Sequence, residues 1–155
     1  MSQMQPRFST DLWPSLVPFE VERVHALAVY CSDGRFGEQC DDYLQRRLGL
    51  PFYDRLAVPG GAALLAADRE QTQLFPHLHF LVEAHELTKL VLIAHDGCAY
   101  YSQLLGLGPI DMRERQEADL KAVSDLVSAK HPHLDIHTSF AHVEGDRVTF
   151  EQLRF

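Results

Sequence analysis

The feature that most restricts the fold of this chain is a run of apolar residues at positions 90–94, Leu-Val-Leu-Ile-Ala, which follows Lys89. A strand that is apolar on both faces is typical of the centre of a parallel sheet, where helices cover the two sides. A near-continuous apolar run at residues 24–30 predicts a second buried strand. Residues 54–58 predict a shorter strand, which ends at the Pro-Gly-Gly sequence of residues 59–61 and leads into a flexible loop.

Apolar residues with helical spacing lie between these strands. They predict helices over residues 37–48, 75–87 and 111–130. Two last segments, residues 134–143 and 147–150, have the pattern of a strand pair joined by a turn. Strands that alternate with helices predict a three-layer α/β domain with a mostly parallel central sheet flanked by helices.

The size and charge of the chain limit what else it can be. Its 155 residues, 46% of them hydrophobic, suffice for one core, so we expect a single domain over residues 1–155. Within it, residues 1–20 combine prolines with Trp13 and Phe19 and are expected to form an irregular or short helical arm. A net charge of -8 argues against nucleic acid as a partner, since proteins that bind it collect Lys and Arg on one face.

The apolar runs are far shorter than the ~20 residues that cross a bilayer. The chain also starts with polar residues rather than with a basic region followed by an apolar one. We therefore expect a soluble, cytoplasmic protein without a membrane partner.

Three cysteines, Cys31, Cys40 and Cys98, are too few and too odd in number for a disulfide framework. Thiolate chemistry or metal binding is the better interpretation. Cys40 falls on the apolar side of the predicted helix over residues 37–48, so we expect it to be a core residue.

The other two cysteines are placed for metal binding. Cys31 closes the first predicted strand and His95 closes the central one, and function in an open α/β sheet collects where strands end at their carboxyl edge. The His-x-x-Cys spacing lets His95 and Cys98 reach one ion, and Cys31 adds a third ligand. Zinc accepts thiolate and imidazole, and a set of two cysteines and one histidine leaves a fourth position for water, as catalytic zinc sites do.

The sequence Cys-x-Asp-x-Arg at residues 31–35, followed by His-x-x-Cys at residues 95–98, resembles the β-class carbonic anhydrases. The similarity extends loosely from about residue 24 to residue 150, and the chain looks like a divergent, short member of that family. The resemblance implies three zinc ligands: Cys31, His95 and Cys98. It also implies that Asp33 and Arg35 form the catalytic dyad.

This resemblance implies a zinc lyase that interconverts carbon dioxide and bicarbonate through zinc-bound hydroxide. An ionised Asp33 would accept a hydrogen bond from the zinc-bound water, and Arg35 would hold the carboxylate charged and in place. If Arg35 let go, Asp33 could swing onto zinc and occupy the open position. The family also implies a homodimer or a higher even-numbered homo-oligomer, with the apolar arm as a cross-subunit anchor.

The chain departs from the family pattern around the expected pocket. Residues 57–59 are Ala-Val-Pro where the family has a polar Arg-Asn pair, and residues 60–61 are glycines that either form a turn or line the pocket. Tyr100 and Tyr101 stand shortly after Cys98, where small residues are usual, so they are expected to narrow the cavity. Two alternatives therefore stay open: a zinc hydrolase of carbonyl sulfide or carbon disulfide, and a non-catalytic zinc-stabilised α/β module that binds a partner.

Several histidines are not used by this interpretation. They are His77, His79, His85, His131, His133, His137 and His142. They show no compact set with a third ligand, so a second metal site is not expected. Any of them could shuttle protons, because imidazole titrates near neutral pH.

Overall fold

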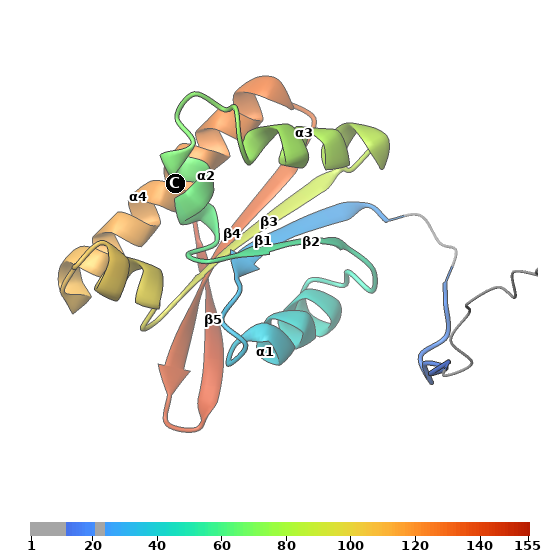
Figure 1. Cartoon of the computed structure of the whole chain (residues 1–155), viewed down its shortest axis with the longest axis horizontal. Helices are drawn as coiled ribbons and strands as arrows, with labels where there is room; N and C mark the ends of the chain where they lie inside the picture. Colours follow the sequence, from blue (N-terminus) through green and yellow to red (C-terminus); the bar gives the residue numbers. More distant parts are fainter. Residues whose placement is uncertain (1–11, 21–23) are drawn as a thin grey trace, which may run out of the picture.

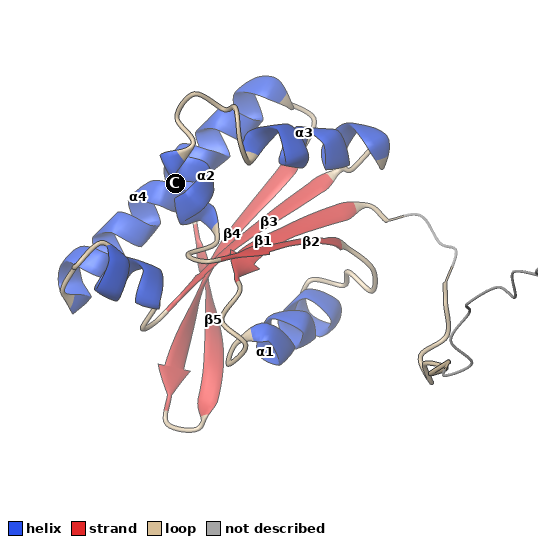
Figure 2. Ribbon diagram, in the orientation of Figure 1, coloured by secondary structure: helices blue, strands red, loops and turns tan. Residues whose placement is uncertain are grey.

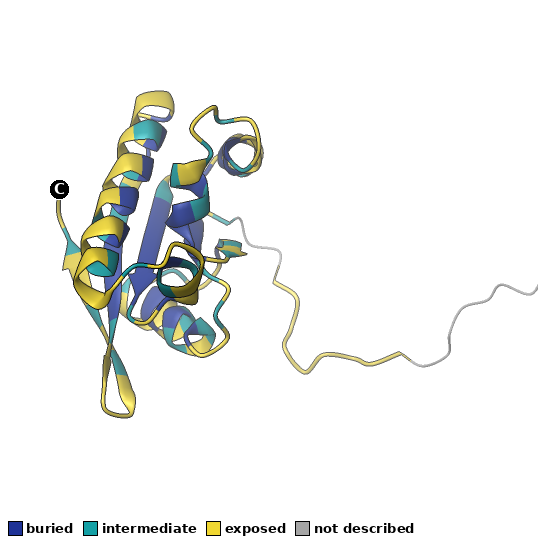
Figure 3. Cartoon of the chain, turned by 60° about the vertical axis from the view of Figure 1, so that its left-hand side comes forward, coloured by how far each residue is buried: buried dark blue, intermediate teal, exposed yellow. Residues whose placement is uncertain are grey.

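The computed structural model describes residues 12–20 and 24–155. The expectations for residues 1–11 and 21–23 lie outside this described part of the chain. Residues 12–20 form neither helix nor strand, and their large apolar side chains, such as Trp13 and Phe19, are exposed (Figure 3). From residue 24 on, the chain forms an α/β domain in which helices cover both faces of one sheet (Figures 1 and 2).

The sheet has five strands in the order β2-β1-β3-β4-β5. The strands are β1 Ala26–Cys31, β2 Asp54–Val58, β3 Lys89–His95, β4 Asp135–Glu144 and β5 Arg147–Leu153. The first four are parallel, and β5 runs antiparallel to β4 after a tight turn. Each strand overlaps the segment predicted for it, so the mostly parallel sheet is confirmed.

Six helical segments connect and flank the strands. They are α1 Gly37–Asp42, η1 Tyr43–Arg47, α2 Ala62–Ala67, α3 Phe75–Ala84, η2 Tyr100–Leu104 and α4 Pro109–Lys130. The η segments are π-helical turns, and α1 continues directly into η1, so the two together account for the helix predicted over residues 37–48. Within the described residues, each helix is too short or too polar to cross a membrane.

The core lies on both faces of the sheet. In β1, Leu27 and Val29 face α2, α3 and α4, whereas Ala28 and Tyr30 face α1, because side chains alternate along a strand. This burial on both faces is the reason why the central strands are apolar without interruption. Cys40 is buried in the α1 face, as predicted.

The prediction of a flexible loop after β2 is wrong. The N–H of Gly61 donates to the carbonyl of Val58 (2.8 Å) and closes a turn, and α2 begins at the next residue. Since α2 consists only of alanine and leucine, which are the strongest helix formers, the glycines before it mark the start of a helix rather than a long loop. The helix α3 is also shorter than predicted, because the positive φ of Glu86 (48°) turns the chain towards β3.

Candidate metal centre

The strands β1 and β3 lie side by side in the centre of the sheet, and the chain leaves them in opposite directions. The connection from β1 leads outward to β2 across one face, and the connection from β3 leads to β4 across the other face. Such a switch in direction opens a crevice at the carboxyl ends of the two strands, which is the usual place for a site in an open α/β sheet. Cys31 is the last residue of β1 and His95 is the last residue of β3.

The structure brings Cys31, His95 and Cys98 together in this crevice. Their ligand atoms, two sulfurs and a ring nitrogen, all lie within 4.8 Å of one another. Among the described residues, no other three His, Cys, Asp or Glu side chains converge in this way. The convergence predicted from the sequence is therefore present.

The imidazole of His95 is oriented by its own turn. Its Nδ1 lies 2.6 Å from the carbonyl oxygen of Asp96, and because a carbonyl only accepts, Nδ1 carries the proton. The ring of Phe36 packs against the imidazole with 4.1 Å between the ring centroids. The remaining atom, Nε2, is buried and has no hydrogen-bond partner in the described protein. It is left with a free lone pair, which suits a metal ligand.

The sulfur atoms of the two cysteines lie within hydrogen-bond distance of each other. The sulfurs of Cys31 and Cys98 are 3.9 Å apart, and the hydrogen bond from the Cys98 thiol lowers the pKa of Cys31 to about 4. As the donor of that bond, and through its burial, Cys98 has a raised pKa. The contact between the two sulfurs therefore favours the ionised form of Cys31, and the thiolate is the form in which a cysteine binds a metal.

These residues fit zinc. Two sulfurs and one imidazole nitrogen with a free lone pair are a donor set that zinc prefers over calcium or magnesium, which take oxygen ligands. The carboxylate of Asp33 does not belong to the group of converging ligand atoms. Among the described residues, three side chains could therefore hold a metal ion here.

Asp33 is held by Arg35 at the rim of the crevice. The guanidinium of Arg35 contacts both carboxylate oxygens, with Nη2 2.6 Å from Oδ2, and the backbone N–H of Arg35 donates to Oδ1 (3.0 Å). These bonds lower the pKa of Asp33 to about 2, so it is ionised at neutral pH. The structure thus pairs Asp33 with Arg35, and the catalytic role of the two residues stays a prediction.

A hollow of about 570 Å³ adjoins Cys31 and Asp33. Most of its other walls are apolar, and the remaining lining residues are Ser32, Pro59, Gly60, Ala99, Tyr100, Gln103 and Leu104. An apolar hollow with a few polar groups at one end is typical of a site for a small, weakly polar ligand.

The two tyrosines after Cys98 have different positions. Tyr100 lines the hollow, as expected, and its ring leaves no room for a side chain at residue 60, since a Cβ there would lie 2.8 Å from the ring. Gly60 also has a positive φ of 74°, so it both forms the turn and lines the hollow. Tyr101 does not narrow the cavity, contrary to our expectation, because it is buried and its hydroxyl donates to Asp119 of α4 (2.8 Å).

The sequence-based interpretation missed the contribution of α4 to this site. Gln116 donates from Nε2 to the carbonyl of His95 (2.9 Å), and Asp119 accepts from Tyr101. A signal was available, because both residues lie on the apolar side of the helix with Leu120 and Val123. A polar residue on such a side is buried and needs a partner.

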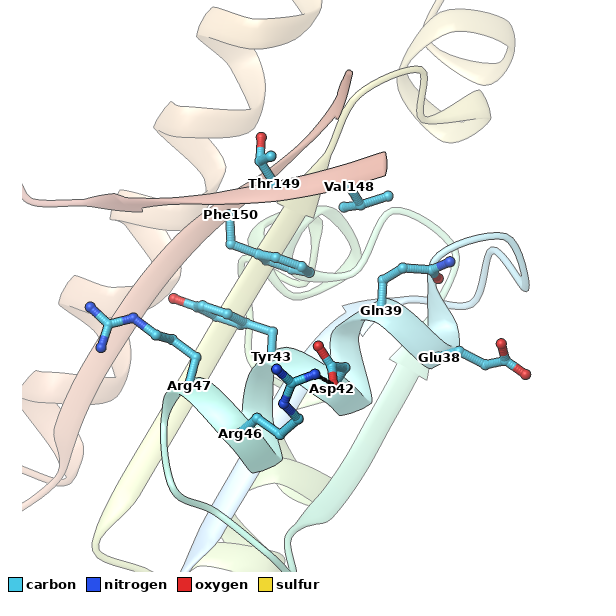
Figure 4. Close-up of a pocket in the computed structure, with 9 residues that line it drawn as sticks. All are labelled: Glu38, Gln39, Asp42, Tyr43, Arg46, Arg47, Val148, Thr149 and Phe150. Atoms are coloured by element: carbon cyan, nitrogen blue, oxygen red, sulfur yellow. Dashed lines mark hydrogen bonds and ion pairs between the residues drawn. The ribbon is translucent and has the colours of Figure 1, made fainter. Parts of the chain in front are cut away.

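A second hollow of similar size, about 580 Å³, lies between α1–η1 and β5 (Figure 4). The rings of Tyr43 and Phe150 stack in it at 4.1 Å, and Asp42 pairs with Arg46 at its rim. It contains none of the three clustered ligand residues.

The remaining histidines do not form a second metal cluster within the described chain. The closest two are His79 of α3 and His131 after α4, whose Nδ1 and Nε2 atoms are 2.9 Å apart. His133 packs edge-on against His131. His142 contacts Glu151 (2.7 Å) on the outer part of β4 and β5.

The chain is similar to known proteins both in sequence and in fold. A family model described as "Putative carbonic anhydrase" matches residues 21–149. An uncharacterized protein of Rickettsia conorii is 25% identical over 127 residues, which cover 77% of this chain and 68% of that protein.

Several solved structures are similar in fold. The β-carbonic anhydrase isoform I of Trichomonas vaginalis has a TM-score of 0.54 at 15% identity, over 88% of this chain and 87% of that chain. The β-carbonic anhydrase CafD of Aspergillus fumigatus has a TM-score of 0.51 at 18% identity, over 89% and 94% of the two chains. One of two tetrameric β-carbonic anhydrases of Sordaria macrospora has a TM-score of 0.54 at 13% identity, over 83% and 81%. At these identities the likeness concerns the fold.

Proposed function

The chain belongs to the carbonic anhydrase family, as a divergent member with the β-class fold, and from this premise we propose that it is a zinc lyase that hydrates carbon dioxide reversibly to bicarbonate. The observation that carries the proposal is the convergence of Cys31, His95 and Cys98 within 4.8 Å beside the paired Asp33. In a purely structural zinc centre, a carboxylate held ionised next to an open position would have no task.

The three converging residues would hold the metal, and zinc there would lower the pKa of a water ligand so that hydroxide becomes available near neutral pH. Two thiolates cancel the formal charge of the ion, so this acidification is weaker than with three neutral ligands. Help from the protein is therefore needed to prepare the attacking water.

Asp33 supplies that help. Because its pKa is low, the carboxylate is ionised at working pH and accepts a hydrogen bond from the attacking water, which directs a lone pair of that water at the substrate carbon. Arg35 keeps the carboxylate in one orientation through its two-pronged contact. The water adds to the carbon, its second proton leaves to solvent or buffer, and bicarbonate is the product.

The hollow beside the dyad would hold the substrate. Its apolar walls, Pro59, Tyr100 and Leu104 among them, suit carbon dioxide, which has no net dipole. The same walls suit carbonyl sulfide and carbon disulfide, so a hydrolase of these related electrophiles is the second candidate. The observation that favours it is Tyr100, which reshapes the hollow where the family has small residues.

Metal analysis combined with stopped-flow carbon dioxide hydration tests the proposal. We expect about one zinc per chain and hydration that rises with pH as the water loses its proton. Zinc without hydration, but with turnover of carbonyl sulfide, would favour the second candidate. Zinc with neither activity would leave the third reading, a zinc-stabilised binding module, and a chain that retains no zinc would contradict all three.

We also propose that the protein is a homodimer or a higher even-numbered oligomer. The exposed apolar residues of the arm, Leu12, Trp13, Leu16, Val17 and Phe19, are a surface that a second copy would cover. Light scattering of the wild type and of Trp13→Ser tests this, and a monomeric wild type would contradict it. The cytoplasmic location stays a prediction.

A further inference from the structure

Both ends of the turn that carries His95 and Cys98 are tied to one turn of α4. At one end, Gln116 donates to the carbonyl of His95 (2.9 Å). At the other end, Asp119 accepts a hydrogen bond from the hydroxyl of Tyr101 (2.8 Å). The two α4 residues are three positions apart and therefore lie on one face of the helix, where both are buried (2% and 6% exposed).

Tyr101 connects α4 to the thiol. Its backbone N–H donates to the carbonyl of Cys98 (3.1 Å), and its side chain packs with Cys98 and Ala63 in a small buried cluster. The tyrosine is 1% exposed, so its hydroxyl has no access to water as a substitute partner. Any change in the position of this ring is passed directly to the residue that bears the sulfur.

The acceptor is itself fixed. One carboxylate oxygen of Asp119 bonds Tyr101, and the other accepts from Nε of Arg115, one helical turn earlier (3.1 Å). Because both oxygens are hydrogen-bonded, the carboxylate is held in one orientation and offers the tyrosine hydroxyl a single acceptor position.

We infer that Tyr101 and Asp119 are positioning residues of the metal centre, whose hydrogen bond holds the turn with Cys98 in register with His95 and Cys31. The inference rests on the proposed function, because it supposes that the cluster binds zinc. Partners that lie behind the ligands of a metal orient them, and their removal typically weakens metal binding by about 10- to 100-fold. A bond with a merely structural role would lower the stability of the chain and leave its affinity for zinc unchanged.

Two tyrosine variants form a matched pair for the test. Tyr101→Phe removes the hydroxyl that bonds Asp119, whereas Tyr53→Phe removes the hydroxyl of another buried tyrosine, which bonds Asp41 and lies just before the start of β2, outside the hollow. Zinc affinity is measured by competition with a chromophoric chelator. We expect Tyr101→Phe to bind zinc about 10- to 100-fold more weakly than the wild type, and Tyr53→Phe to bind it as the wild type does.

Substitution of the acceptor gives a second, independent measurement in case Tyr101→Phe does not fold. Asp119→Asn keeps an oxygen that can accept from Tyr101 and should retain most of the affinity, whereas Asp119→Leu should bind zinc as weakly as Tyr101→Phe. If Tyr101 and Asp119 act through one bond, the double variant Tyr101→Phe/Asp119→Leu should lose no more affinity than either single one.

The visible absorption of the cobalt-substituted protein reports on the thiolate ligands directly. We expect the thiolate-to-cobalt bands to shift in Tyr101→Phe and to stay unchanged in Tyr53→Phe. Equal zinc affinity and equal spectra for Tyr101→Phe, Asp119→Leu and the wild type would overturn the inference and leave the proposed function intact. Failure of the wild type to bind zinc would instead overturn both.

Discussion

The molecule has two groups of closely spaced side chains of the kinds that can bind metals, and the groups differ in what their nitrogens and sulfurs face. Cys31, His95 and Cys98 meet at the carboxyl end of β1 and β3, where a ring nitrogen of His95 lies within 4.8 Å of both sulfurs and its Nε2 has no hydrogen-bond partner. His79 and His131 meet between α3 and the end of α4, where one imidazole bonds the other (2.9 Å).

The difference shows that proximity alone does not make a metal site. The histidine pair uses one nitrogen of each ring for the contact between them, and although the Nε2 of His79 is buried without a partner, no further ligand atom of the described residues converges on it. In the cysteine–histidine cluster, the orienting bond of His95 goes to a backbone carbonyl, so its second nitrogen stays free to bind an ion. What distinguishes the two groups is a shared centre with three donors around it.

The largest expected difference between the two groups is in zinc binding after one side chain of each group is substituted. Loss of a residue that only orients a metal ligand typically weakens metal binding by ~10- to 100-fold. We expect Cys98→Ser to weaken zinc binding by more than this and to abolish carbon dioxide hydration. His131→Asn should keep the zinc content of the wild type, because its imidazole contacts those of His79 and His133 and is not part of the cysteine–histidine cluster. The measurement is metal analysis after dialysis, with hydration rates beside it.

Loss of zinc in His131→Asn but not in Cys98→Ser would show that the ion sits between α3 and α4 instead of at the edge of the sheet. The proposed function would then have no metal at the dyad.

The Asp33–Arg35 pair allows a second test of the comparison, since this carboxylate held by an arginine lies beside the cysteine–histidine cluster. Asp33→Asn should keep zinc and reduce the rate of carbon dioxide hydration by about 100-fold. This is the lower end of the range typical for the loss of a general acid or base. Asp42→Asn is the matched control, because it also breaks a contact of a carboxylate with an arginine, Arg46, but far from the cluster. Stopped-flow rates and zinc content are measured for both variants.

If Asp33→Asn and Asp42→Asn hydrate carbon dioxide equally fast, Asp33 is a structural partner of Arg35 and no more. The dyad would then have to be removed from the proposed mechanism.

The smallest expected effect is the one that protonation of His79 and His131 has on the free energy of unfolding. Burial lowers the pKa of both His79 and His131, with Lys130 and His133 acting in the same direction on one or both rings and Glu83 opposing them. The unfolded chain therefore takes up protons first as the pH falls below about 6.5, the ordinary histidine value. The free energy of unfolding should decrease from about pH 7 to pH 5, and the pair should contribute no such slope above pH 7.

Denaturant titrations at several pH values measure this slope. It should be shallower in His79→Leu/His131→Leu and unchanged in His77→Gln, which alters an exposed histidine of the same helix α3. Both variants keep the metal cluster, so its own pH dependence cancels in the comparison with the wild type. An unchanged slope in the double variant would show that the pair is not responsible for it.

Much of the fold could be predicted because its signals are local. The uninterrupted apolar run of β3 has few alternatives to a central parallel strand, and α4 has a helical pattern between Gly108 and Pro132. The error after β2 arose where two signals compete. The glycines at positions 60 and 61 were given more weight than the alanines and leucines of α2, although the glycines only form the turn before the helix.

In the candidate site, too, some features follow from local sequence signals and others do not. The meeting of Cys31 with His95 follows from the sequence, because parallel strands end at one edge and each residue closes its strand. The separate positions of Tyr100 and Tyr101 do not follow from it. On a helix, neighbours point about 100° apart, and the sequence does not say which of the two faces the hollow and which faces α4.

By itself, then, the sequence determined the order of the strands along the chain and brought forward the candidate ligand residues and the Asp33–Arg35 pair, because these depend on apolar periodicity and on residues close to strand ends. Only the tertiary structure decided what stands behind the ligands. The bonds from α4 to His95 and Tyr101 join residues 21 and 18 positions apart, and they form because a buried polar group must find its partner in whatever the packing brings next to it. That requirement is physical and general, but its outcome depends on how α4 lies across the sheet, which no local pattern specifies.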